Sequence, residues 1–287
     1  MFNKKEFYKL EKRSLIKIFG KDKFSFIQGI ISNDIENLKK KSAIYSSILT
    51  PQGRFVTDFF ISKYKDFLFM EINKKNEQEI IQKLNFYKLR SDVTIEVEKY
   101  SSVFLLSNDS ENDLKEINEN HYCFEDPRFK KLFKRLYILN DSKLIKLEDF
   151  KLIKITEEKF NNMRLKYSIP DFQYDAEQNK SLLMEMRFDD LNGISWEKGC
   201  YMGQEITARM KYRNLMKKKI FKIKIDFNKN IEKEIKLNEE VIGSISSHNK
   251  IDGLAYFNLK KNNQNSKSEM QSGDSMIKIE KLWWSND

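Results

Sequence analysis

A chain of 287 residues with 40% hydrophobic and 33% charged side chains can bury a substantial core and still present a polar surface to water. No apolar run approaches the length of a membrane span, which excludes a protein built from membrane-spanning helices. The first 13 residues are basic and lack the apolar core of a secretion signal. Two cysteines, Cys123 and Cys200, are too few and too far apart for a disulfide framework or a metal site, so we expect no metal and a reducing, cytoplasmic location.

The excess of 53 basic over 43 acidic residues gives a net charge of +10. This charge is compatible with a nucleic-acid-binding protein, an acidic small ligand or an acidic partner protein. The lysines are scattered over every segment, and the one dense run is the three lysines at residues 217–219. We interpret the charge mainly as a basic, solvated surface and keep nucleic-acid binding as an alternative function.

The first hundred residues carry patterns of both strands and helices. Asp22 is placed to cap a short helix over residues 23–30, and a capping box at residues 76–79 predicts a second helix with Ile80, Leu84 and Tyr87 on one face. A turn at residues 51–53 contains proline and glycine. Apolar or alternating runs predict strands at residues 14–19, 44–50, 54–64, 67–72 and 93–98.

A second series of elements follows. We predict strands at residues 101–106, 121–126 and 135–139, a helix or loop at 109–120, and a helix over 149–167. Strands and helices are mixed without a regular βαβ rhythm, which favours an α+β fold over a doubly wound sheet.

The pattern changes after residue 219. Four strand-like runs at residues 221–227, 240–247, 253–259 and 277–284 predict a small β-barrel or sandwich without helices. Residues 260–275 are polar and of low complexity, which is typical of a mobile loop.

The segment around Cys200 is unusual because two of the nine glycines of the chain, Gly199 and Gly203, flank it. Residues 194–196 predict a strand and residues 204–212 a helix, so Cys200 is expected at a strand-to-helix turn. The amino end of the helix and the nearby Lys198 would both favour the thiolate. The alternative is a small, buried and unreactive cysteine. The two histidines have no neighbours that suggest a cysteine–histidine hydrolase.

The run Lys-Gly-Cys-Tyr-Met-Gly-Gln-Glu at residues 198–205, continued by Ala208 and Arg209, resembles the hallmark motif of the YgfZ-type folate-binding proteins, distant relatives of the glycine-cleavage T-protein. Other stretches resemble family elements in the same order along nearly the whole chain. They lie at residues 26–34, 49–54, 87–93, 126–128 with Arg135, 164–170 and 183–185. Two local departures are Ser168, where glycine is usual, and Leu183, where proline is common.

The resemblance implies a T-protein-like folate-binding fold of class α+β. Its two mixed α/β halves would cover about residues 1–98 and 99–215, and a C-terminal β-barrel would cover 216–287. It also implies tetrahydrofolate or a one-carbon derivative as cofactor, and iron–sulfur client or scaffold proteins as partners of a monomeric accessory factor.

The resemblance also suggests site residues. Glu185 looks like the pterin-binding glutamate of T-proteins, and one carboxylate can accept both donors of a pterin edge. An alternative for Glu185 is a salt bridge with Arg187 or another base. Asp58, Gln204 and Arg209 are further candidates for folate binding, and Arg209 is also spaced to pair with Glu205.

Cys200 and Lys198 are the candidate catalytic residues, with Cys200 as the key thiol. The rival enzymatic function is folate-dependent aminomethyl transfer. T-proteins carry paired aspartates where this chain has Thr57 and Asp58, so one carboxylate of the pair is missing. This departure argues against aminomethyltransferase activity.

Overall fold

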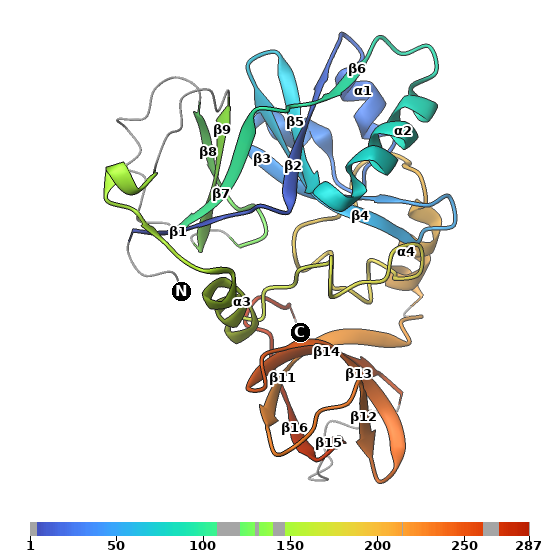
Figure 1. Cartoon of the computed structure of the whole chain (residues 1–287). Coiled ribbons are helices and arrows are strands. Elements are labelled where there is room, and N and C mark those ends of the chain that lie inside the picture. Colours follow the sequence, from blue (N-terminus) through green and yellow to red (C-terminus); the bar gives the residue numbers. More distant parts are fainter. Residues whose placement is uncertain are drawn as a thin grey trace. The chain divides into compact units, whose positions relative to one another are not determined.

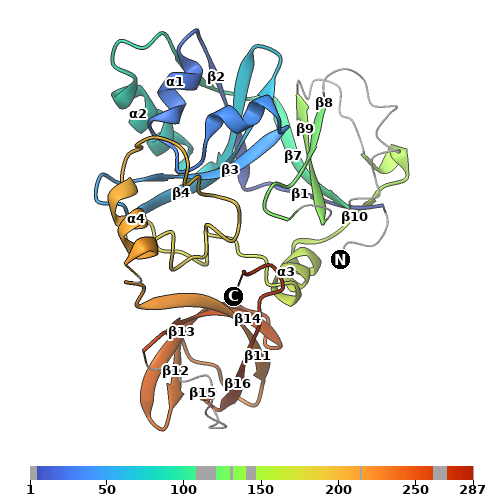
Figure 2. The same cartoon turned by 180° about the vertical axis from the view of Figure 1, so that it is seen from behind.

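The computed structural model describes residues 5–107, 121–129, 132–139, 147–213, 215–260 and 270–286. The chain forms two compact units (Figures 1 and 2). Unit 1 comprises Met1–Leu49, Val56–Glu157 and Leu191–Met202, and unit 2 comprises Thr50–Phe55, Glu158–Asp190 and Gly203–Asp287. The domain boundaries expected from the sequence stay a prediction. The segment predicted at residues 109–120 lies outside the described residues.

The first sheet of unit 1 has five strands in the order β3-β4-β5-β2-β6. Their bounds are Ala43–Leu49, Phe55–Tyr64, Phe67–Asn73, Arg13–Phe19 and Thr94–Val97. The helical elements of this part are α1 (Lys23–Gln28), η1 (Ile35–Lys39), η2 (Lys74–Asn76) and α2 (Glu77–Lys88). Ile27 of α1 and Ile80 and Leu84 of α2 join the buried core of this sheet, so the helices pack on one of its faces.

The second sheet of unit 1 also has five strands, in the order β10-β1-β7-β9-β8. Their bounds are Ile153–Lys154, Glu6–Lys9, Ser101–Ser107, Phe133–Leu139 and His121–Glu125. A short helix, η4 (Leu147–Phe150), precedes β10. Leu15 and Phe69 of the first sheet share a buried cluster with Val103 and Tyr137 of the second, so the two sheets pack together.

Unit 2 contains a closed barrel with the strand order β11-β14-β13-β12-β15-β16 (Figure 1, orange to red). The strand bounds are Lys218–Asp226, Asp252–Asn258, Glu240–His248, Glu234–Leu237, Met270–Ser272 and Ser275–Glu280. Two helices, α3 (Glu157–Lys166) and α4 (Gln204–Tyr212), precede the barrel. Ile223, Ile235, Ala255 and Phe257 fill the barrel, because alternate residues of each strand point inward.

The mixed α+β class and the C-terminal barrel are therefore confirmed, but several details differ. The side chain of Asp22 does not cap α1, because it accepts a hydrogen bond from the backbone of Asp92. Asn76 does not cap α2 either, and its amide donates to Thr57 Oγ1.

Three further predictions differ from the structure. The helix expected over residues 149–167 begins only at Glu157, because residues 153–154 pair with β1. Residues 194–196 form no strand, since their segment is fixed by contacts to residues 29–33. Of the loop expected at 260–275, residues 261–269 lie outside the described residues, whereas β15 and the start of β16 occupy 270–272 and 275.

Within the described ranges, no helix is both long and apolar enough to cross a membrane. The same residues contain no cluster of three or more histidine, cysteine, aspartate or glutamate side chains that could hold a metal ion.

Candidate functional site

The Cys200 motif of unit 1 lies in an irregular segment, Leu191–Met202, which we call the strap. The strap is bonded to the chain that follows α1. Ser32 Oγ donates to the carbonyl of Gly193 over 2.7 Å, and the amide of Ser195 donates to the carbonyl of Ser32. The amide of Met202 donates to the carbonyl of Gly29 over 3.1 Å. Two motifs that are about 165 residues apart in the sequence thus form one substructure.

Lys198 is the central contact of the strap. Its Nζ lies 2.6, 2.8 and 2.9 Å from the carbonyl oxygens of Gln28, Ile31 and Asn33. The residue is only 8% exposed, and burial lowers the pKa of its ammonium group to about 8. At neutral pH the group therefore remains an ammonium, and its three N–H donors match the three carbonyls.

Cys200 is exposed, whereas Cys123 on β8 is half-buried. The two glycines beside Cys200 have different roles. Gly203 precedes α4 with φ at +78°, a left-handed conformation that strongly favours glycine. A Cβ added to Gly199 would meet no atom within 4 Å, and its φ lies outside the left-handed region. Of these two positions, only residue 203 therefore has a backbone conformation that requires glycine.

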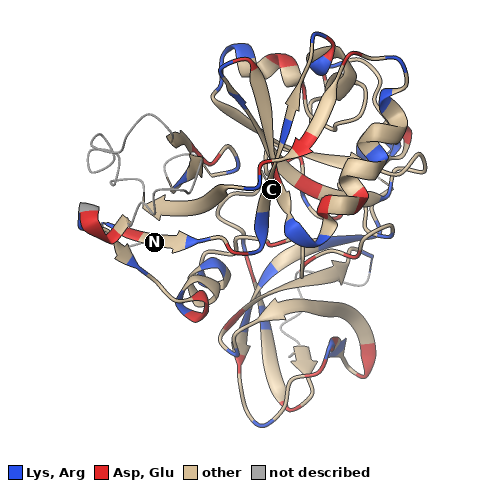
Figure 3. Ribbon diagram, turned by 45° about the horizontal axis from the view of Figure 1, so that its top comes forward, with Lys and Arg blue, Asp and Glu red and all other residues tan. Residues whose placement is uncertain are grey.

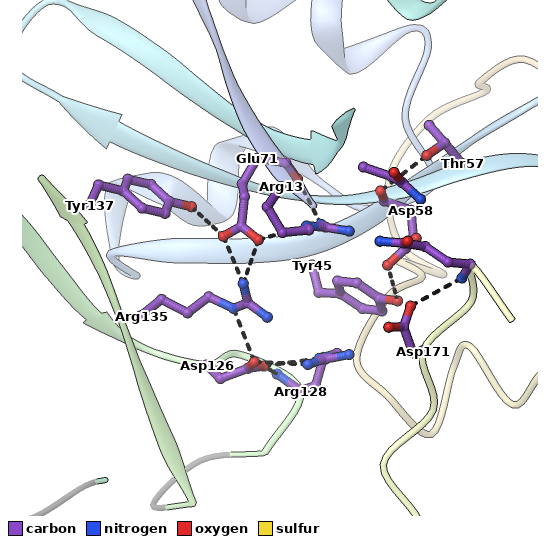
Figure 4. A network of polar contacts seen from close by, with 12 residues as sticks. Arg13, Tyr45, Thr57, Asp58, Glu71, Asp126, Arg128, Arg135, Tyr137 and Asp171 are labelled. Atoms are coloured by element: carbon purple, nitrogen blue, oxygen red, sulfur yellow. Dashed lines mark hydrogen bonds and ion pairs between the residues drawn. The ribbon is translucent and has the colours of Figure 1, made fainter. Parts of the chain in front are cut away.

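Asp58 is a buried carboxylate on β4 (Figure 4). The phenol of Tyr45 donates to its Oδ2 over 2.9 Å. Burial, followed by the charge of Asp58, raises the pKa of Tyr45 well above its usual value, so the phenol stays a donor. The carboxylate of Asp58 is thus already held by a protein group.

An extended ion network crosses between the two sheets of unit 1 (Figure 4). Arg135 of β9 contacts both carboxylate oxygens of Glu71 on β5, at 2.5 and 2.7 Å, and it also pairs with Asp126. Arg13 of β2 and the phenol of Tyr137 are further partners of Glu71, and Arg128 is a further partner of Asp126. The Asp-Pro-Arg run in the sequence indicates part of this network, but the sequence does not show which arginines pair with Glu71.

Glu185, in unit 2, is a carboxylate with unused acceptor capacity. Burial raises its pKa, and Lys218 Nζ forms a long ion pair with it at 3.9 Å, which is the alternative of a salt bridge with another base. Among the described residues, none donates a hydrogen bond to this carboxylate. The alternative pair with Arg187 does not form, because Arg187 donates to Ile220 and pairs with Asp190.

The remaining candidates lie on α4 of unit 2. Gln204 is its first residue, and Arg209 is exposed and pairs with Glu205 at 2.9 Å, as the spacing predicted. The structure thus assigns Lys198, Cys200 and Asp58 to unit 1, and Glu185, Gln204 and Arg209 to unit 2.

The basic residues are interspersed with acidic ones along both units (Figure 3). The three lysines at residues 217–219 lead into β11, where Lys222 pairs with Glu280 and Lys224 with Asp252. This pairing reduces the positive charge available on that strand and does not favour a nucleic-acid surface.

The fold is that of the glycine-cleavage T-protein. The aminomethyltransferase T of the glycine cleavage system from Bartonella henselae matches 98% of this chain and 86% of its own, with a TM-score of 0.81 and 11% sequence identity. This likeness confirms the expected fold. No family model matches the sequence.

Relatives by sequence are iron–sulfur cluster assembly factors. The chain is 27% identical to the mitochondrial IBA57 homologue of Dictyostelium discoideum, over 81% of this chain and 65% of the relative. It is 29% identical to the Neurospora crassa homologue, over 74% of this chain and 52% of the relative, and 22% identical to the Mus musculus protein, over 76% and 66%. The chain thus spans about half to two thirds of these proteins. All three are named as mitochondrial, which contradicts the cytoplasmic location expected from the sequence.

Proposed function

We propose that this chain is a tetrahydrofolate-binding accessory factor in the assembly or repair of iron–sulfur proteins, with Cys200 as its key thiol. The observation that carries the proposal is the similarity to named iron–sulfur cluster assembly factors over about three quarters of the chain. The partners would be iron–sulfur client or scaffold proteins.

Folate binding is supported by the chemistry of Glu185. Its side chain is mostly buried and accepts no hydrogen bond from the described residues, so its oxygens are available to the donors of a ligand. A pterin carries an amino group and a ring N–H on one edge, which one carboxylate can accept together. Gln204 and Arg209 are proposed as further folate contacts, with Arg209 suited to the acidic folate tail. Tetrahydrofolate would supply one-carbon carrier chemistry.

Cys200 suits a role toward a partner protein because its side chain is exposed while its neighbours Lys198 and Tyr201 are buried. A thiol on a fixed segment can meet a partner without a large rearrangement of the chain. The proposal therefore assigns the thiol to the partner and Glu185 to the folate.

Complementation tests the proposal. A strain that lacks its own assembly factor should recover the activity of iron–sulfur enzymes when it expresses this chain, and the Cys200→Ser variant should restore much less. Calorimetry with a reduced folate should show binding to both proteins. No recovery with a well-expressed, folded chain would overturn the assembly function, and absence of heat with any reduced folate would overturn folate binding.

Aminomethyl transfer is the second candidate, because the fold is shared with an aminomethyltransferase. Against it, Thr57 replaces one carboxylate of the expected pair, and Asp58 is held by Tyr45. Formation of methylenetetrahydrofolate from an aminomethylated lipoyl carrier would establish this activity, and its absence would leave the assembly function unaffected.

A further inference from the structure

Three backbone carbonyls near the end of α1 converge on one side chain. The helix ends at Gln28, and the carbonyls of Gln28, Ile31 and Asn33 all accept from Lys198 Nζ. The carbonyl of Gln28, at the helix end, has no partner within the helix, and those of Ile31 and Asn33 lie beyond it, so all three must be satisfied from elsewhere. The ammonium group of a residue about 165 positions later in the chain supplies those donors here.

Cys200 lies midway between the two inner anchors of the strap. Lys198, two residues before it, is anchored through its side chain, and Met202, two residues after it, through its amide to Gly29. Both anchors attach to the same short stretch of chain after α1. A segment fixed at both ends over so few residues retains little backbone freedom.

The ammonium group has no donor left for the thiol. A lysine carries three N–H donors, and three carbonyl oxygens within 2.9 Å account for all of them. Lys198 therefore has no donor left for a hydrogen bond to sulfur, and what its three contacts fix is the backbone of the strap that carries Cys200.

We propose that Lys198 is the positioning residue of Cys200, and that its ring of three carbonyls holds the strap so that the thiol projects from a fixed place on unit 1. This role depends on the proposed function in one respect, namely that Cys200 is the key thiol. The geometry itself can be measured without any activity.

Distances between two nitroxide labels test the role. In a C123S background, one label is attached to Cys200 and the other to Q82C, an exposed position on α2 of the same unit. Lys198→Met keeps the length of the side chain but removes all three donors. We expect a distance distribution at least twofold broader than in the protein with Lys198. Lys41→Met, which removes an exposed lysine, should leave the width unchanged.

A second label pair separates positioning from general loosening of the unit. Labels at Q82C and E125C, with both native cysteines replaced by serine, report on α2 and β8 outside the strap. Their distribution should stay narrow in Lys198→Met. If this variant does not fold, the widths of the two distance distributions are compared in Lys198→Gln instead. Glutamine keeps two donors on a shorter side chain.

An unchanged width for the pair 82–200 would overturn the proposal. Equal broadening of both pairs would also overturn it, because Lys198 would then stabilise the whole unit. Neither result depends on complementation, so failure of this inference is distinguishable from failure of the proposed function.

Discussion

Arg135 and Glu71 form a two-pronged ion pair between different sheets of unit 1, with Nη1 at 2.5 and 2.7 Å from the two carboxylate oxygens (Figure 4). Glu71 is fully buried, and burial alone would raise its pKa. The guanidinium groups of Arg135 and Arg13 outweigh that effect and lower the pKa instead. The carboxylate is therefore ionised at neutral pH and connects β5 to β9.

Removing the charge of Glu71 should destabilise unit 1 strongly. Glu71→Gln leaves two buried guanidinium groups with one carboxylate fewer, and breaking a buried pair in this way costs about 3–5 kcal/mol. Urea unfolding should show a lower midpoint. Glu205→Gln, which breaks the exposed pair with Arg209, is the matched control and should cost about 1 kcal/mol or less. Equal effects of the two changes would contradict a structural role for the network.

The network should also make the protein sensitive to acid. Burial would raise the pKa of Asp126, but Arg128 and Arg135 dominate and lower it to about 2 from 3.8. A depressed pKa contributes stability above the unfolded value, and this stability is lost as the pH falls from about 4 toward 2. Two pKa units correspond to roughly 2–3 kcal/mol. Asp126→Asn should be less stable at pH 7, and its stability should fall less steeply over that range.

The two glycines beside Cys200 should respond differently to alanine. Gly203→Ala forces a left-handed φ on a residue with a Cβ, at a cost of about 1–2 kcal/mol. Gly199→Ala meets open space and should be neutral, or stabilising by up to about 1 kcal/mol. Thermal unfolding of the two variants measures the difference. A large loss for Gly199→Ala alone would show that this backbone is strained.

Folate affinity should depend on Glu185 and on pH. Glu185→Gln keeps the size but loses the charge, and the loss of one charge-assisted pair should weaken binding roughly 10- to 100-fold. Because burial raises the pKa of Glu185 above 4.5, affinity should begin to fall at a higher pH than for an ordinary glutamate. Calorimetry across the acidic range would reveal this, and the Gln variant should lack that part of the pH dependence. The same affinity in both proteins would place the pterin elsewhere.

Within the polar segment 260–275, a deletion in residues 261–269 should be tolerated, whereas a deletion of residues 270–275 should not. Residues 270–272 form β15, which pairs with β12 and β16 and so helps to close the barrel. Deleting residues 270–275 removes this strand pairing. Because a loss of about 1 kcal/mol lowers the melting temperature by a few degrees, we expect a decrease of more than about ten degrees. Similar melting temperatures for the two deletions would show that β15 is dispensable.

The strands were largely predictable from the sequence, because alternation and apolar runs are local signals. Caps were less predictable. Asp22 and Asn76 have suitable side chains, but Asp92 and Thr57 compete for them through contacts made only in the folded chain. The role of Lys198 could not be predicted at all, because its partners are backbone carbonyls that carry no sequence signal.

Cys200 is indicated by its motif and Glu185 by its resemblance to the pterin-binding glutamate of T-proteins. The structure adds that Glu185 is buried and that Cys200 is exposed. The network around Glu71 was missed for a related reason. A lone glutamate in an apolar strand indicates a buried partner, but the sequence does not say which of many arginines supplies it.

The way in which the chain returns to unit 1 has a consequence for its synthesis. Strand β1 (Glu6–Lys9) pairs in parallel with β10 (Ile153–Lys154), and Lys198 completes the contacts of residues 28–33. The ribosome must therefore have synthesised the strap before unit 1 can close. Contacts between residues far apart in the sequence slow folding. Until they form, apolar strands remain exposed and prone to aggregation. The nascent chain should accordingly depend on chaperones, and fragments that end before the strap should be poorly soluble.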